Sequence, residues 1–176
     1  MDEKQEFHAG YVAVIGRPNV GKSTLINVLL GQKVAAVSPR PQTTRRRQLG
    51  ILTTDQAQII FVDTPGLHQP RHKLGESMNQ EARSALEHSD AVLFIVDASE
   101  PPTDEDRLLA GLIAGLPTQT QVWLVLNKYD RVPVDAQANL ERAYRELLPS
   151  VPAIWVSATR GDFLSELMHN LTTHLP

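Results

Sequence analysis

The chain has 176 residues, of which 41% are hydrophobic, so it is long and apolar enough for one globular domain with a sizeable core. Its net charge of −3 gives no general electrostatic attraction to nucleic acid or to anionic membranes. The lack of cysteine excludes disulfides and thiolate metal sites, and no apolar run approaches the roughly 20 residues that span a bilayer. The polar start, MDEKQEFHAG, lacks the apolar stretch of a signal peptide, so we expect a cytoplasmic domain.

Short apolar runs alternate with longer helical stretches, which is typical of a mostly parallel sheet covered by helices. The predicted strands are 11–16, 48–54, 56–63, 91–97, 122–127 and 153–157. The predicted helices are 22–30, 76–88, 134–148 and 162–175, with a further helix opened by Thr103 and capped by Asp106 three residues on. The second and third strands flank a short turn and predict a hairpin. Two long irregular stretches remain, 31–46 and 64–75, and loops of this length in a compact domain are usually functional.

The stretch GRPNVGKS at 16–23 fits the pattern G-x-x-x-x-G-K-[ST] and lies between a predicted strand and a predicted helix. Gly16 and Gly21 allow the tight turn that points backbone N–H groups at phosphate oxygens, and the helix N-terminus adds the positive end of its dipole. Lys22 would reach the β and γ phosphates, and the Ser23 hydroxyl would bind Mg²⁺. A chance match is expected in well under about 1% of chains of this length. The sequence therefore predicts a nucleotide-binding phosphate loop.

The tetrapeptide NKYD, at the end of the fifth predicted strand, indicates which base is bound. The Asp130 carboxylate can accept from both the ring N–H and the exocyclic amine of guanine, whereas adenine lacks both donors in that arrangement. The aliphatic part of Lys128 could cover the base, and the Asn127 amide could tie the loop to neighbouring backbone. SAT follows the next strand, where the Ala158 N–H is placed to meet the guanine carbonyl oxygen. Together the two motifs predict guanine specificity.

Two further segments indicate a response to the γ phosphate. Asp63 ends a predicted strand and begins DTPG, so its carboxylate can hold a Mg²⁺-bound water while the Gly66 N–H senses the γ phosphate. In the loop at 31–46, Thr43 and Thr44 are candidates for closing over Mg²⁺ when GTP is present.

The set GRPNVGKS, PQTTRR, DTPG, NKYD and SAT resembles the translation-factor-related GTPases, and most closely the Era family of ribosome-assembly GTPases. PRPQTTRRR and DTPGLH are the most family-specific parts, and the resemblance covers about 9–176. It implies an α/β fold, the Ras-like P-loop GTPase domain, with a six-stranded mostly parallel sheet, one antiparallel strand (the first of the hairpin) and five flanking helices. It also favours Thr44 over Thr43 as a Mg²⁺ ligand. The expected activity is that of a GTP-binding and slowly GTP-hydrolysing switch.

Proteins of the Era family continue into a C-terminal KH-type RNA-binding domain, whereas this sequence stops at Pro176. We therefore expect 1–176 to form a single GTPase domain without the KH domain. The resemblance implies that the intact protein binds small-subunit ribosomal RNA and the 30S subunit through that domain, and it allows a peripheral contact with the inner face of the cell membrane. The basic run at 45–47 could contact RNA or a partner, but a solvated segment entering a strand is the simpler interpretation.

Leu67 stands where phosphate-hydrolysing loops often carry a glutamine that holds the attacking water, and leucine can neither donate nor accept a hydrogen bond. Lys22, Mg²⁺ and the loop amides can still neutralise phosphate charge, so Lys22 and Gly66 are the predicted catalytic residues. The neighbouring His68 is a weaker candidate for orienting water. In related GTPases an asparagine at the position of Asn19 accompanies a bound K⁺ that supplies positive charge, which makes K⁺ a candidate cofactor beside Mg²⁺.

The predicted nucleotide site is assembled from the phosphate loop, DTPG with its following residue, NKYD and SAT. Its residues are Gly16, Arg17, Pro18, Asn19, Val20, Gly21, Lys22, Ser23, Thr24, Asp63, Thr64, Pro65, Gly66, Leu67, Asn127, Lys128, Asp130, Ser157 and Ala158. The predicted Mg²⁺ ligands are Ser23, Thr44 and, through a water, Asp63. Two alternatives stay open: a GTP-binding assembly module with negligible hydrolysis, and another P-loop ATPase or kinase.

Overall fold

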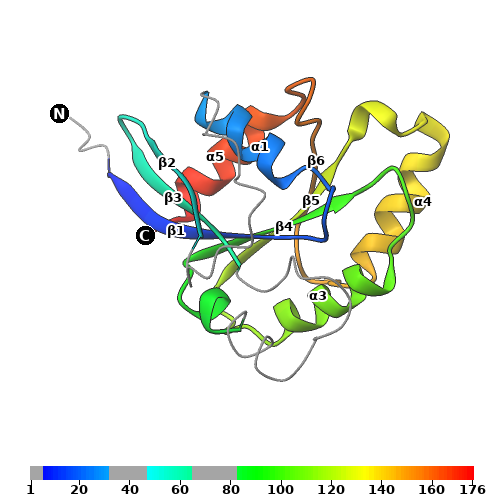
Figure 1. The fold of residues 1–176 in the computed structure, drawn as a ribbon, viewed down its shortest axis with the longest axis horizontal. Helices are drawn as coiled ribbons and strands as arrows, with labels where there is room; N and C mark the ends of the chain where they lie inside the picture. The colour runs from blue at the N-terminus through cyan, green and yellow to red at the C-terminus, as the bar shows by residue number, and fades with distance from the viewer. Residues whose placement is uncertain (1–5, 32–46, 65–82) are drawn as a thin grey trace.

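The computed structural model describes residues 6–31, 47–64 and 83–176, in which a central sheet lies between two layers of helices (Figure 1). The strands are β1 (His8–Ile15), β2 (Arg47–Thr53), β3 (Ala57–Asp63), β4 (Ala91–Asp97), β5 (Gln121–Asn127) and β6 (Ala153–Trp155). The helices are α1 (Lys22–Leu30), α3 (Asp104–Ala114), α4 (Val134–Arg145) and α5 (Leu164–His174), with a short 3₁₀ turn η1 (Tyr129–Arg131) and a helical segment at 83–87.

The six strands form one sheet in the order β2-β3-β1-β4-β5-β6. Every neighbouring pair is parallel except β2 and β3, which are antiparallel and joined by a short turn. The predicted fold is therefore confirmed, including the antiparallel first strand of the hairpin and, with the segment at 83–87, five helices.

Each face of the sheet has its own buried core, because successive side chains of a strand point to opposite faces. Along β1, Val12 and Val14 belong to the core under α1 and α5, whereas Ala13 and Ile15 belong to the core under α3 and α4. Figure 1 shows α1 and α5 together on one side of the sheet and α3 on the other. Every residue of β4 is buried, which explains why this strand reads as an unbroken apolar run.

Most boundaries follow the prediction to within two residues, but α4 ends at Arg145 rather than at residue 148, and β1 and β6 differ because of backbone pairing. β1 begins at His8 rather than at residue 11 because its first residues pair with β3, and because the Ala9 N–H donates to the Pro176 carbonyl oxygen at 2.7 Å. β6 ends at Trp155, and Ser157 instead forms an isolated bridge with Asp162. The predicted capping box at the start of α3 is confirmed. Most of the two predicted loops and the first part of the predicted helix 76–88 lie outside the described residues.

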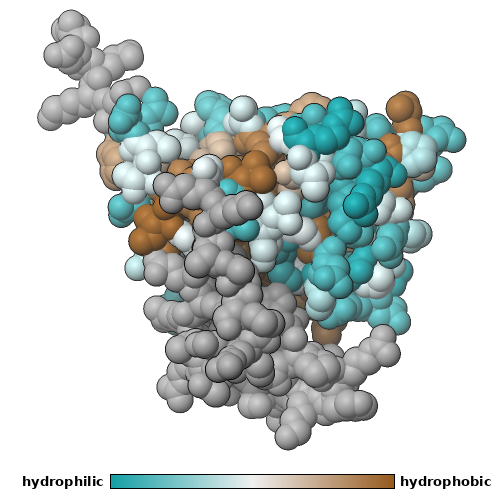
Figure 2. Space-filling model, turned by 45° about the horizontal axis from the view of Figure 1, so that its top comes forward, coloured by the Kyte–Doolittle hydropathy of each residue, from teal (hydrophilic) through white to brown (hydrophobic). Residues whose placement is uncertain are grey.

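The surface combines polar and apolar side chains. In the coloured part of the face shown in Figure 2, the apolar side chains form separate small groups among polar ones. No helix in the described ranges is both long and apolar enough to cross a membrane.

Candidate functional site

The predicted site residues of the described segments lie at one edge of the sheet, where the parallel strands end. The phosphate loop follows β1, Asp63 ends β3, Asn127 ends β5, and Ser157 and Ala158 come shortly after β6. In open α/β sheets this edge is where ligands bind.

The backbone of the phosphate loop is shaped by two glycines that no other residue could replace without a collision. A Cβ on Gly16 would lie 2.4 Å from the Ile95 carbonyl oxygen. Gly21 has a φ of 103°, and a Cβ there would lie 2.3 Å from Asn127 Nδ2. Asn19 also adopts a left-handed conformation, with a φ of 66°. The loop therefore turns tightly against β4 and β5 before α1 begins at Lys22.

The Lys22 ammonium lies over this loop. It donates to the Gly16 carbonyl oxygen and, at 3.1 Å, to that of Arg17. Only 9% of Lys22 is exposed, and burial lowers its pKa to about 8 although Asp63 and Glu105 act in the opposite direction. A buried cation held by neutral carbonyl oxygens at a helix N-terminus favours an anionic ligand such as a phosphate.

Asn127 joins the phosphate loop to the loop after β6. Its Nδ2 donates to the Val20 carbonyl oxygen at 2.8 Å, so the side-chain amide ties its loop to neighbouring backbone as predicted. Its Oδ1 accepts from the Ala158 N–H at 3.1 Å. The sequence predicted that this N–H would meet a guanine carbonyl oxygen, so a bound guanine would have to share it with Asn127.

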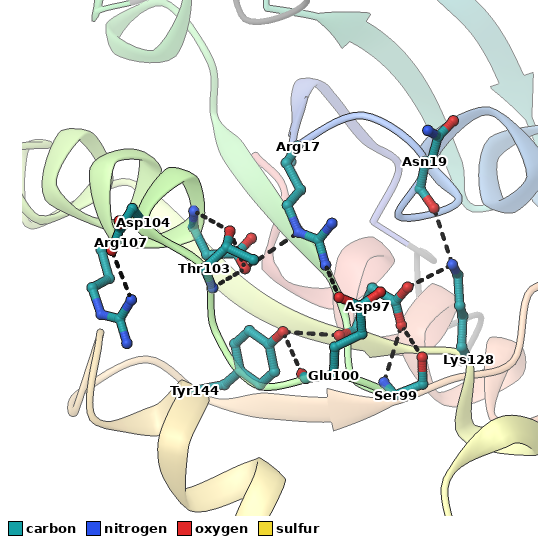
Figure 3. A network of polar contacts seen from close by, with 12 residues as sticks. Arg17, Asn19, Asp97, Ser99, Glu100, Thr103, Asp104, Arg107, Lys128 and Tyr144 are labelled. Carbon is teal, nitrogen blue, oxygen red and sulfur yellow. Dashed lines mark hydrogen bonds and ion pairs between the residues drawn. The ribbon is translucent and has the colours of Figure 1, made fainter.

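Lys128 and Asp130, the two charged residues of NKYD, are each held by a side-chain contact. Lys128, with a φ of 68°, donates from Nζ to Asp97 Oδ2 at 2.6 Å and to the Asn19 carbonyl oxygen at 3.0 Å (Figure 3). The Lys128 ammonium therefore bridges the end of β4 and the phosphate loop. Asp130 is exposed, and its Oδ1 accepts from the hydroxyl of the fully buried Ser157 at 2.7 Å.

Two loops carry the motifs predicted to bind the base, NKYD at 127–130 and the loop after β6 at 156–163, and we call them the base-side loops. Aromatic side chains that were not predicted as site residues support both loops. The ring of Tyr129, inside NKYD, makes edge contacts with Trp155 at 5.9 Å and Phe163 at 5.2 Å between centroids. Phe163 has a φ of 60°, which is uncommon for a bulky residue. No local signal predicts this contact, because the two loops meet only in the folded chain.

Asp97 is a second residue that the prediction omitted, although a signal was present. It ends a buried strand and pairs in register with Asn127. Burial raises the pKa of Asp97, but hydrogen bonds from Lys128 and Ser99 outweigh this and hold the pKa below its usual value. The signal was an acidic residue at the carboxyl end of an apolar strand, the same pattern that singled out Asp63.

The donor atoms among the described residues fit Mg²⁺. Ser23 is exposed in the first turn of α1. Asp63 is 8% exposed at the end of β3, and it lies near enough to Lys22 to act on the pKa of that lysine in the raising direction. A hydroxyl and a carboxylate are the hard oxygen ligands that Mg²⁺ prefers. In the described ranges no group of three His, Cys, Asp or Glu residues could hold a metal. Thr44, Pro65, Gly66 and Leu67 lie outside the described residues.

Comparison with known proteins decides the family. The family model of the 50S ribosome-binding GTPases matches residues 11–128. The chain is 46% identical over 172 residues, 97% of its length, to GTPase Era from Nostoc sp., and 56% identical over 131 residues, 74% of its length, to GTPase Era from Deinococcus radiodurans. The chain belongs to the Era family of GTPases. It spans 52% and 42% of these two Era proteins, about half of their length.

Solved Era structures have the same fold. One is Era from Aquifex aeolicus with a tyrosine replaced by alanine, bound to GDP·AlF₄⁻, which matches with a TM-score of 0.76. Another is Era in complex with MgGDPNP and nucleotides 1506–1542 of 16S ribosomal RNA, which matches with a TM-score of 0.78. Both are 39% identical to this chain, and the match covers 97% of this chain and 58% of theirs. A bacterial selenocysteine-specific elongation factor, 19% identical with a TM-score of 0.67, shares the fold.

Proposed function

We propose that this chain binds GTP and GDP together with Mg²⁺ and hydrolyses GTP slowly, as the switch domain of a protein that acts in assembly of the small ribosomal subunit. The observation that carries the proposal is Asn127, whose amide joins the phosphate loop to the base-side loop after β6 in one site. The family assignment supports it.

The residues of this chain would divide the work between phosphates and base. The amides of the phosphate loop, the N-terminus of α1 and Lys22 would hold the phosphates and neutralise the charge that develops during hydrolysis. Asp130, oriented by Ser157, would accept from the guanine donors. Mg²⁺, held by Ser23 and through a water by Asp63, would supply further positive charge at the β and γ phosphates when bound. Thr44 and Gly66 complete the proposed set.

K⁺ is a further proposed cofactor, through Asn19. Asn19 is exposed, its backbone is left-handed, and its carbonyl oxygen is held by Lys128, so its side chain starts from a fixed position on the loop. If K⁺ supplies charge here, turnover in KCl should exceed turnover in NaCl, and Asn19→Ala should remove the difference. Equal rates in the two salts at matched ionic strength would exclude this role.

RNA binding is proposed for the whole protein. A relative whose structure contains a 16S ribosomal RNA segment is longer than this chain, which covers 58% of it. We assign the small-subunit RNA and 30S contacts to the KH-type domain that the family carries after its GTPase domain, and 1–176 to the GTPase domain itself. The same proposal places the protein in the cytoplasm, with a peripheral contact at the inner face of the membrane.

The deciding experiment titrates the purified chain with fluorescent guanine and adenine nucleotides in the presence of Mg²⁺. We expect GTP and GDP to bind and ATP not to compete, because only guanine offers two donors to Asp130. ATP that binds as tightly as GTP would overturn guanine specificity in favour of an ATPase or kinase.

Single-turnover hydrolysis then separates a slow GTPase from a binding module. Phosphate release should be measurable in the wild type and lost in Lys22→Ala, while Arg107→Ala, at an exposed position on α3, should match the wild type. Tight GTP binding without phosphate release beyond the Lys22→Ala background would support the binding module instead.

A further inference from the structure

Arg17 lies in the phosphate loop, but its side chain extends to the start of α3 (Figure 3). Its Nε lies 3.4 Å from Asp106 Oδ2, and its Nη2 lies 3.5 Å from Glu100 Oε2. The Arg17 side chain is 15% exposed, and that of Asp106 is fully buried. The guanidinium therefore connects the loop to α3 and to the segment between β4 and α3.

The capping box does not require the negative charge of Asp106. Its Oδ2 accepts from the Thr103 N–H at 2.9 Å and from the Thr103 hydroxyl at 3.1 Å, which are contacts that a neutral amide oxygen could also make. A fully buried carboxylate is costly without a cation. Within the described part of the chain, the cation paired with Asp106 is Arg17.

Arg17 remains charged in this environment. Burial lowers the pKa of its guanidinium, but Asp106, Glu100, Tyr144 and Asp97 act in the opposite direction and together outweigh burial, so the pKa lies above its usual value. The guanidinium is therefore positively charged beside Asp106.

The phosphate loop is also held at a second point, through Lys128 and through Asp97 at the end of β4. Asp97 accepts from Lys128, and Lys128 donates to the Asn19 carbonyl oxygen. The segment that begins at the end of β4 is anchored on α4, because the Tyr144 hydroxyl contacts the Asp97 and Glu100 carbonyl oxygens at 2.8 and 2.9 Å (Figure 3). The loop is therefore held at residues 17 and 19, on both sides of Pro18.

We propose that Arg17 is a positioning residue for nucleotide binding, which through its ion pair with Asp106 holds the phosphate loop in the conformation that presents its N–H groups to the phosphates. This inference rests on the proposed function. The loop contains two left-handed residues, Asn19 and Gly21, so it requires tertiary contacts to keep this shape. If the loop adopts the nucleotide-binding conformation for only a fraction of the time, its apparent affinity for the nucleotide is reduced by that fraction.

The test is a double-mutant cycle on nucleotide affinity. Arg17→Met keeps the length of the side chain and removes its charge, and Asp106→Asn keeps an acceptor for the cap and removes the partner charge. Each single variant should weaken GDP binding by about tenfold, and the double variant should lose about the same rather than about a hundredfold, because the same Arg17–Asp106 ion pair is lost in all three. Arg17→Lys should lose less, since it keeps the charge but cannot contact both carboxylates as a fork.

The matched controls are Arg107→Met and Asp104→Asn, which disrupt an exposed ion pair on the same helix, with a distance of 3.2 Å. Both should bind GDP like the wild type. Thermal unfolding of every variant shows whether it is folded at the binding temperature, and affinities are compared for folded protein only. A contact that serves only stability would lower the melting temperature and leave the affinity of the folded protein unchanged.

The outcomes separate the two proposals. Wild-type GDP affinity in Arg17→Met and Arg17→Lys would overturn the positioning role while the proposed function stands. Losses that multiply in the double variant would also overturn it, because the two residues would then act independently. If the wild type binds no guanine nucleotide, the proposed function fails, and the role of Arg17 in nucleotide binding fails with it.

Discussion

Asp130 is the side chain on which the choice of base would depend. Its Oδ1 accepts from the hydroxyl of Ser157, which is fully buried and therefore orients the carboxylate at the surface. An acceptor pair held in this way matches two neighbouring donors of guanine.

Asp130→Asn should weaken GDP binding about a hundredfold or more, since two charge-assisted hydrogen bonds are lost, and should favour xanthosine diphosphate, because the new N–H₂ group donates to its additional carbonyl. Competition between the two nucleotides measures the change. Asp135→Asn, at an exposed position five residues on, is the control and should keep the wild-type preference. Retained guanine preference in Asp130→Asn would refute the role of this carboxylate.

Gly21 is the residue at which the shape of the phosphate loop depends most directly on backbone freedom. Gly21→Ala places a Cβ 2.3 Å from Asn127 Nδ2 at a φ of 103°, so it should break the bond from Asn127 to Val20 and lower the free energy of unfolding by about 2–4 kcal/mol. Gly31→Ala is the control: its φ is 64° but no atom of the described residues lies within 4 Å of the new Cβ, so it should cost only the backbone strain of about 1–2 kcal/mol. Urea unfolding compares the two, and equal losses would show that the contact with Asn127 is unimportant.

At the scale of the element, α3 combines an optimised start with a weak interior. The capping box of Thr103 and Asp106 satisfies its first amides, and its first turn carries three acidic residues that complement the helix dipole. Gly111, in contrast, is exposed in the middle of the helix, where glycine is entropically unfavourable.

Gly111→Ala should therefore stabilise the protein by about 0.5–1 kcal/mol, since no atom of the described residues lies within 4 Å of the new Cβ. This corresponds to a rise in melting temperature of roughly 1–4 °C for a chain of this length. Differential scanning calorimetry measures it, and GDP affinity should stay at the wild-type value. A lower melting temperature would mean that the helix is not present as described.

At the scale of the whole molecule, the proposed site exists only when the sheet has formed. Its parts follow four different strands, and Asn127 reaches Val20 across 107 positions of sequence. A nucleotide that needs all of these parts binds the folded state and not the unfolded one.

The melting temperature should therefore rise with GDP concentration, with a stabilisation of about 2.7 kcal/mol at a hundred times the Kd. Lys22→Ala should show little of this shift, and ATP should produce none in the wild type. A wild-type melting temperature that does not change with GDP would contradict a guanine-nucleotide site.

What could be predicted from sequence was whatever depends on near neighbours in the chain. The apolar run of β4 predicted a strand buried on both faces, and Thr103 with Asp106 predicted a helix start, because both signals lie within a few residues. The start of β1 was missed since it depends on pairing with Ala57 and with the distant Pro176.

The sequence by itself determined the order of the elements, the phosphate loop and the guanine motifs, because each is a local pattern of residue types at fixed spacing. Only the tertiary structure decided that Arg17 pairs with Asp106, that Asp97 holds Lys128 against the phosphate loop, and that Tyr129 meets Phe163. The two hydrogen bonds of Lys128, for example, join residues that are 31 and 109 positions apart in the sequence. Such partners come together only when the strands pair and bring their carboxyl ends to one edge.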